Sequence, residues 1–165
     1  MLGQERVNYP QNHIEADNRL SWILGRIDKQ YGDSALYVHL KRNKTGTAKS
    51  FSRRYEDGII KAYRDGILKC AAGKSDCMSV SLDYCDTVNS NIKFFLQGKS
   101  KKITINLENI EKNFTEFWYM IDAQGAIGAA LAEFKKNIMQ QVKGVNQKRR
   151  KEEISSKESP VREED

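Results

Sequence analysis

Arg42 and Ser50 stand eight positions apart, and their side chains together have the chemistry to bind a phosphate group. Arg42 directly follows a short β-rich run, Ala35–Lys41, and Ser50 falls one turn into the helix expected to follow. In an α/β sheet, ligands bind beyond the carboxyl ends of the strands, where N–H groups of a following helix face an anion. A guanidinium and a hydroxyl that converge there form an anion pocket.

An alternative interpretation involves no ligand. Arg42 would then be a surface arginine at the end of a strand, and Ser50 would only begin a helix, as such residues do in many unrelated α/β proteins. The two interpretations differ in whether the two side chains face the same point.

The elements around this pair follow from the spacing of apolar residues. Helical spacing predicts five helices, over 15–31, 47–72 with breaks or kinks at Gly58 and Gly66, 82–95 with an end at Gly98, 110–121, and about 126–142. The composition and alternation of two other runs predict strands over Ala35–Lys41 and Lys102–Leu107. Each strand is therefore followed by a helix.

Strands followed by helices predict parallel β-α units in a layered α/β fold. Two strands cannot form a protected sheet, so we expect a helix-rich part of a layered α/β fold, over residues 1–144, that begins in mid-fold. Residues 145–165 are charged and nearly without apolar side chains, so we expect a disordered tail.

The segment YVHLKRNKTGTAKSFSRR resembles the sulfotransferase segment in which a hydrophobic strand ends in Arg and a Ser follows eight positions later. The likeness continues through GIIKAYRDGIL, VNSNIKFFLQG and ITINLENIEKNFTEFWYMIDAQG, and covers roughly residues 15–134. The resemblance implies that Arg42 and Ser50, with Lys44 nearby, bind the 3′-phosphate of the donor 3′-phosphoadenosine 5′-phosphosulfate (PAPS). It also implies a P-loop-like three-layer fold, of which this chain holds a part, and a hydroxyl or amine acceptor of unknown identity. It further implies a structural role for Glu108.

The sequence departs from the family in the loop that would hold the reactive sulfate. Family members cradle the 5′-phosphosulfate in a basic Gly/Ser/Thr loop after their first strand, and no comparable segment is present. The family's Arg-Asp-Pro reads Arg42-Asn43-Lys44 here, which removes a turn-fixing proline and adds a charge. We therefore expect binding of the 3′-phosphate without sulfuryl transfer by this chain alone.

Sulfuryl transfer needs a base that takes the proton of the acceptor. The resemblance implies a Glu or His from the region before the first helix, so Glu15 is the first candidate and His13 the second. The alternative is that this polar segment only begins the helix, with Asp17 or Asn18 as its cap.

Composition restricts the class of protein. The chain of 165 residues has 39% hydrophobic residues, enough for one domain, and no apolar run that could cross a bilayer. It also lacks a secretory leader, so we expect a cytoplasmic protein. Three cysteines and two histidines, without paired close spacing, predict neither a disulfide framework nor a metal site.

The net charge of +6 favours anionic partners, but the stretch 147–151 alone contains four basic residues. This charge leaves open a basic nucleic-acid-binding or adaptor protein without catalysis. Acidic residues interspersed in the same tail argue against strong nucleic-acid binding.

Overall fold

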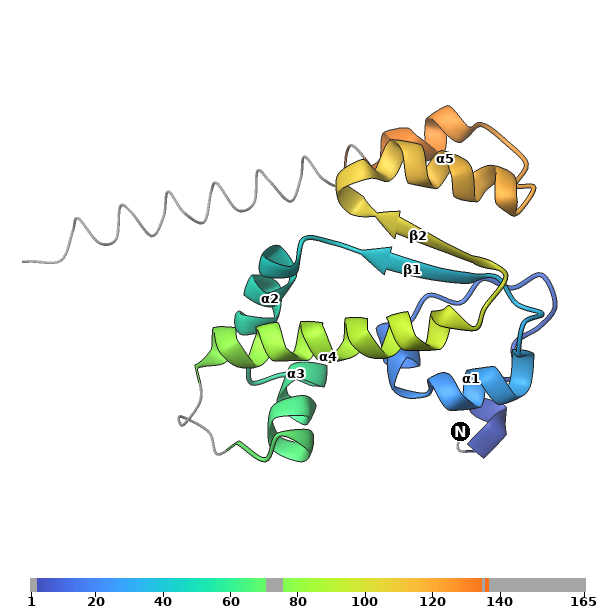
Figure 1. Cartoon of the computed structure of the whole chain (residues 1–165). Coiled ribbons are helices and arrows are strands. Elements are labelled where there is room, and N and C mark those ends of the chain that lie inside the picture. Colours follow the sequence, from blue (N-terminus) through green and yellow to red (C-terminus); the bar gives the residue numbers. More distant parts are fainter. Residues whose placement is uncertain (1–2, 71–75, 135, 137–165) are drawn as a thin grey trace, which may run out of the picture. The chain divides into compact units, whose positions relative to one another are not determined.

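The computed structural model describes residues 3–70, 76–134 and 136, which fall into two compact units, Met1–Asn109 and Ile110–Asp165. The first unit contains four α-helices and two strands among its described residues (Figure 1). In chain order these are α1 (Leu24–Tyr31), β1 (Tyr37–Lys41), α2 (Lys44–Ser52), α3 (Gly58–Ala62), α4 (Cys77–Gln97) and β2 (Lys102–Asn106). Short 3-10 turns cover Gly3–Val7, Asn18–Trp22 and Leu107–Asn109, and a π-helical turn covers Tyr63–Ile67.

The two strands pair in parallel, with Tyr37 opposite Lys102 and Lys41 opposite Asn106. The connection between them contains α2, α3 and α4, which is the long crossover that parallel strands require. The predicted parallel β-α arrangement is therefore confirmed as a helix-rich α/β structure with a two-stranded sheet.

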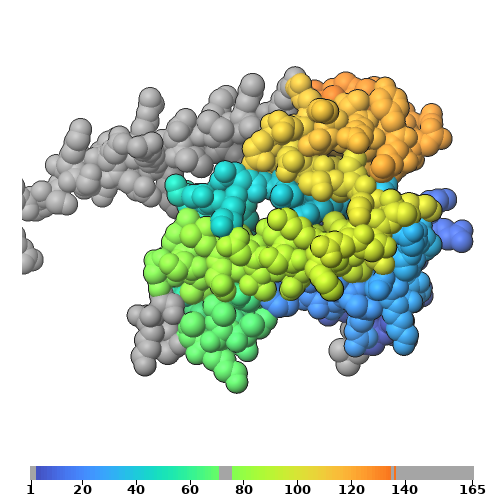
Figure 2. All heavy atoms as spheres, viewed as in Figure 1, coloured from blue at the N-terminus to red at the C-terminus, as the bar shows by residue number. Residues whose placement is uncertain are grey.

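Helix α4 covers one face of this sheet. The ring of Tyr37 meets that of Phe95 edge-on at 5.0 Å, and Nε2 of His39 lies 3.1 Å from Oδ1 of Asn89. Figure 2 shows the atoms of α2 resting on those of α4. A core cluster joins these helices to α3 and consists of Ala48, Ile60, Tyr63, Val80, Tyr84 and Cys85, with Trp22 and Phe51 packed against it.

The predicted helix over 47–72 is divided in the structure. Helix α2 begins earlier, at Lys44, because the side chain of Asn43 caps it, and a capping residue leaves no trace in hydrophobic spacing. The predicted break at Gly58 is confirmed: its φ of +57° lies in the left-handed region that favours glycine. The predicted kink at Gly66 falls within the π-helical turn.

Arg64 fixes this turn from inside the protein. Its side chain is 2% exposed, donates to both carboxylate oxygens of Glu56 at 2.7 and 3.0 Å, and also binds Asp65. Its guanidinium lies 4.5 Å from the centre of the Tyr55 ring. Hydrogen bonds from Arg64 and Lys61 lower the pKa of Asp65 to about 2, so this carboxylate stays charged beside Arg64.

The second unit contains α5 (Ile110–Met120) and a further helix of which residues 127–134 are described. Phe114 lies 4.9 Å from Phe134, 5.9 Å from Trp118 and 6.1 Å from Phe117, measured between ring centres. These aromatic rings pack against one another, as the helical spacing predicts. The remainder of the last predicted helix and the predicted tail lie outside the described residues.

Within the described ranges, no helix is both long enough and apolar enough to cross a membrane.

Candidate anion-binding site

The candidate site begins where β1 ends and α2 starts. Oδ1 of Asn43 accepts a hydrogen bond from the N–H of Gly46 at 2.9 Å, and the carbonyl of Asn43 accepts from both N and Oγ1 of Thr47 at 3.0 Å. These bonds define the first turn of the helix. Only Asn43 separates Arg42 from the amino end of α2, where the helix dipole favours a negative charge.

The guanidinium of Arg42 lies against this first turn. A Cβ atom built on Gly46 would stand 3.8 Å from Nε and 3.9 Å from Nη2 of Arg42, so the guanidinium lies beside the glycine backbone. Sequence reasoning had assigned no role to Gly46 or Asn43. The available signal was an Asn immediately before a helix, which is a preferred capping residue.

Ser50 follows Gly46 by four residues, and residues four apart lie on the same face of a helix. Arg42, Gly46 and Ser50 are thus in one row, with the glycine in the middle. Because α2 begins at Lys44, Ser50 is the seventh residue of the helix and lies deeper in it than the predicted single turn. Its side chain is half-buried.

Lys44 does not join this row. Its Nζ lies 3.1 Å from both carboxylate oxygens of Asp86 on α4, and so it ties the start of α2 to that helix. Two residues along a helix correspond to about 200° of rotation, which places Lys44 nearly opposite Gly46. This contact lends no support to the expectation that Lys44 lies near the phosphate, because its partner is a carboxylate 42 residues away.

Glu108 joins the ends of the two strands. Its Oε1 accepts a hydrogen bond from the backbone N–H of Asn43 at 2.6 Å. This bond holds the pKa of Glu108 below its ordinary value, and the charge of Arg42 acts in the same direction. The structural role implied by the resemblance agrees with this contact, since it links the residues that follow β1 and β2.

The two candidate bases, Glu15 and His13, contact each other but lie in a different part of the first unit from Arg42 and Ser50. Nε2 of His13 is 3.1 Å from Oε2 of Glu15. The His13 ring stacks on Tyr9 at 5.4 Å, and Tyr9 stacks on Tyr31, the last residue of α1. Helix α1 leads into the beginning of β1, whereas Arg42 follows its end. The structure therefore does not bring Glu15 or His13 together with the Arg42–Ser50 row.

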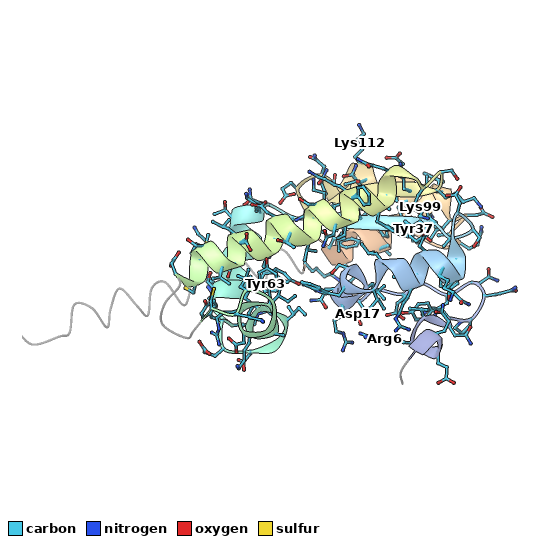
Figure 3. All side chains as sticks on the ribbon, turned by 60° about the horizontal axis from the view of Figure 1, so that its bottom comes forward. Arg6, Asp17, Tyr37, Tyr63, Lys99 and Lys112 are labelled. Atoms are coloured by element: carbon cyan, nitrogen blue, oxygen red, sulfur yellow. The ribbon has the colours of Figure 1, made fainter. Side chains whose placement is uncertain are left out.

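The capping alternative is confirmed for Asp17. Its carboxylate accepts a hydrogen bond from the Arg19 N–H at 2.8 Å and caps the turn Asn18–Trp22 that precedes α1. The hydrogen bonds from Arg19 lower the pKa of Asp17. Figure 3 labels Asp17 among the side chains of this unit. The predicted helix over 15–31 therefore starts as a capped 3-10 turn and continues as α1 to Gly32.

Over the described part of the chain, no group of His, Cys, Asp or Glu side chains is arranged to hold a metal ion. Comparisons of the sequence and the structure with known proteins found no matching family model, no matching curated protein and no matching solved structure. The sulfotransferase resemblance therefore remains a hypothesis from the sequence.

Proposed function

We propose that this chain is a sulfotransferase-like protein that binds the 3′-phosphate of PAPS through Arg42 and Ser50. We further propose that β1 and β2 belong to the parallel sheet of a P-loop-like three-layer fold. The observation that carries the proposal is the position of the Arg42 guanidinium against Gly46, one turn before Ser50, at the carboxyl end of a parallel strand. This is where α/β sheets bind anionic ligands.

Each group in the row has a distinct part in holding the phosphate. The planar guanidinium of Arg42 donates two parallel N–H bonds to two phosphate oxygens, and the hydroxyl of Ser50 donates a third. Gly46 adds no side chain between them, and the amino end of α2 contributes its dipole. Glu108 and Asn43 hold the loop that carries Arg42.

These contacts hold the end of the donor that is remote from the reaction. In the transfer itself, the acceptor oxygen or nitrogen forms a bond to sulfur, the bond from sulfur to the phosphate oxygen breaks, and adenosine 3′,5′-bisphosphate leaves. A base takes the acceptor's proton, and cations stabilise the leaving phosphate. Contacts to the 3′-phosphate alone bind the ground state and the transition state equally and leave the chemical barrier unchanged. We therefore assign donor binding to this site.

Calorimetric titration with adenosine 3′,5′-bisphosphate tests the proposal. Removing the hydrogen bonds of a charged group typically weakens binding about 10- to 100-fold, and we expect this loss for Arg42→Ala. Ser50→Ala is expected to weaken binding about fivefold. Arg26→Ala, at an exposed arginine of α1, is the matched control and should bind like the parent chain.

Unchanged affinity in Arg42→Ala would exclude the site. The nucleic-acid alternative is tested in parallel with duplex DNA at low and high salt, because binding to phosphate backbones weakens steeply with salt. Salt-sensitive DNA binding together with no binding of the bisphosphate would favour that alternative.

A further inference from the structure

The outer edge of β1 is open within the described part of the chain. Strands β1 and β2 form a two-stranded parallel sheet, and no other described segment pairs with either strand (Figure 1). The N–H of Tyr37 donates to the carbonyl of Lys101 at 3.0 Å, so Tyr37 and every second residue after it bond toward β2. The N–H and C=O groups of Val38 and Leu40 consequently point away from β2, toward the free edge.

These outward-pointing groups call for a strand as their partner. Outside the β1–β2 pair, Val38 and Leu40 form no backbone hydrogen bond with any other described residue. An unpaired strand edge is a template for a further strand, because donors and acceptors alternate along it. An extended chain presents the matching groups at the same spacing. The chemistry of the edge therefore favours pairing with another β-strand.

The side chains at this edge are apolar and exposed. Val38 and Leu40 lie on the face of the sheet opposite to α4, since His39, between them, faces that helix. Val38 is 42% exposed and Leu40 is 62% exposed, whereas their register partners Ile103 and Ile105 on β2 are buried. This face of the sheet is closed over β2 and open over β1. A neighbouring strand would cover part of the open apolar surface, which favours association.

We propose that the edge of β1 pairs with the same edge of a second copy of this chain, in the antiparallel direction, about a two-fold axis at His39. Val38 then lies opposite Leu40 of the second copy, and Leu40 opposite Val38 of the second copy. Each of these two pairs exchanges both of its N–H···O bonds. The edge is thus complementary to itself, as an isologous interface requires. The product is a four-stranded sheet with the order β2-β1-β1-β2, a common size for a sheet.

The charges at the ends of β1 favour the antiparallel direction. Lys41 ends the strand and Arg42 follows it directly. A parallel copy would place these cations beside their equivalents, and like charges directly opposite each other destabilise a sheet. The antiparallel register instead places Lys41 opposite Tyr37 and Arg42 opposite Leu36, with Asp33 three residues further along. The two cationic ends therefore lie at opposite ends of the new pair of strands.

Sedimentation equilibrium of the full chain at increasing concentration tests the proposal, and we expect a monomer–dimer equilibrium. Leu40→Pro removes an outward N–H and leaves the bonds to β2 in place. Because the change occurs twice in a dimer, association should weaken about 10- to 100-fold. Leu40→Lys should weaken it as well, since an edge lysine opposes strand pairing. Ile67→Lys, at another exposed apolar residue, is the matched control and should associate like the parent chain.

Disulfide cross-linking tests the register separately, in a chain that also carries Cys70→Ala/Cys77→Ala/Cys85→Ala. An equal mixture of Val38→Cys and Leu40→Cys should cross-link on mild oxidation, because the Cα atoms of such a hydrogen-bonded pair stand about 5.5 Å apart. Leu40→Cys alone should cross-link far less. Its two copies are diagonal neighbours about 7–8 Å apart, which is beyond the usual span of a disulfide.

Three results would overturn the proposal. The first is a chain that stays monomeric at every concentration, and the second is a dimer whose dissociation constant is unchanged in Leu40→Pro. The third is cross-linking of Leu40→Cys alone to the level of the mixture, which would exclude the antiparallel register. None of these measurements contains a nucleotide, so their outcome and that of the titrations at Arg42 are independent.

Discussion

At the scale of single residues, Gly46 leaves space beside Arg42 for the phosphate that we propose. A methyl group at this position would lie 3.6 Å from Oδ1 of Asn43 and 3.8 Å from Nε of Arg42, which are ordinary contact distances. Gly46→Ala should therefore fold, and should gain up to about 1 kcal/mol in free energy of unfolding, because alanine favours helices more than glycine does.

The same methyl group would stand between Arg42 and Ser50. We expect Gly46→Ala to bind adenosine 3′,5′-bisphosphate more weakly while it melts at a higher temperature. Gly128→Ala, where the new atom meets nothing within 4 Å, is the control for the helical effect alone. Tighter nucleotide binding in Gly46→Ala would show that the anion does not approach over the glycine.

A second residue, His39, is predicted to make stability depend on pH. Its side chain is 5% exposed, and burial lowers its pKa despite the hydrogen bond to Asn89. The amide nitrogen of Asn89 donates a hydrogen bond to the carbonyl of Cys85 at 2.7 Å, so the amide oxygen of Asn89 accepts a hydrogen bond from Nε2–H of His39. Lys41 and Lys93 further disfavour a charged imidazole.

The unfolded chain binds a proton at His39 more readily than the folded chain does. The free energy of unfolding should consequently fall as the pH drops through the ordinary histidine value of about 6.5. Urea titrations at about pH 7.5 and about pH 5.5 measure this loss, in a range where few other side chains titrate. His39→Gln, which retains a donor, should be less stable overall but should show a smaller difference between the two pH values. An equal difference in this variant would assign the effect to another group.

At the scale of elements, the start of α2 depends on one side chain. Asn43→Ala removes the cap from Gly46, and such substitutions cost about 1 kcal/mol. The change also loosens the turn that carries Arg42, so nucleotide affinity should fall together with stability. Thermal melting and calorimetry measure the two effects, and Asn91→Ala, at an exposed site on α4, is the control. Loss of stability without loss of affinity would show that the turn does not position Arg42.

The sequence predicts the elements well where their ends have local chemical causes. Gly32 and Gly98 end α1 and α4 as expected, because a glycine after an amphipathic run favours a helix end. The predicted start of α2 at residue 47 was wrong, because the helix begins where Asn43 caps it and apolar spacing does not reveal a cap. The π-helical turn at Tyr63–Ile67 was also missed, since it depends on the buried Arg64 and its contacts with Glu56.

In the candidate site, too, features with local causes can be predicted from the sequence, and features that depend on packing between distant elements cannot. Gly46 and Ser50 share a face of α2 because helical geometry fixes residues four positions apart. Arg42 precedes the cap, so its place beside Gly46 depends on the turn at Asn43. The pairing of Lys44 with Asp86 could not be predicted, because only the packing of α2 on α4 brings them together. The location of His13 and Glu15 similarly depends on the stacking of Tyr9 on Tyr31, which no spacing indicates.

At the scale of the whole molecule, the segment after Gly144 lies outside the described residues, and its expected disorder remains a prediction from composition. A chain that ends at Gly144 should have the same melting temperature as the full chain, because the removed residues offer almost no apolar area to bury. It should also retain its affinity for adenosine 3′,5′-bisphosphate. A clear fall in melting temperature would show that the tail packs on the rest of the chain.

The distribution of the two tryptophans has a consequence for spectroscopy. Trp22 lies 5.9 Å from Tyr63 and 6.2 Å from Tyr84 in the first unit, and Trp118 packs beside Phe114 in the second. Since the chain has only these two, each unit contains its own fluorophore. Emission from Trp22→Phe then reports on the second unit, and emission from Trp118→Phe reports on the first. Coincident urea transitions in the two variants would identify one cooperative system, and separated transitions would give each unit its own free energy of unfolding.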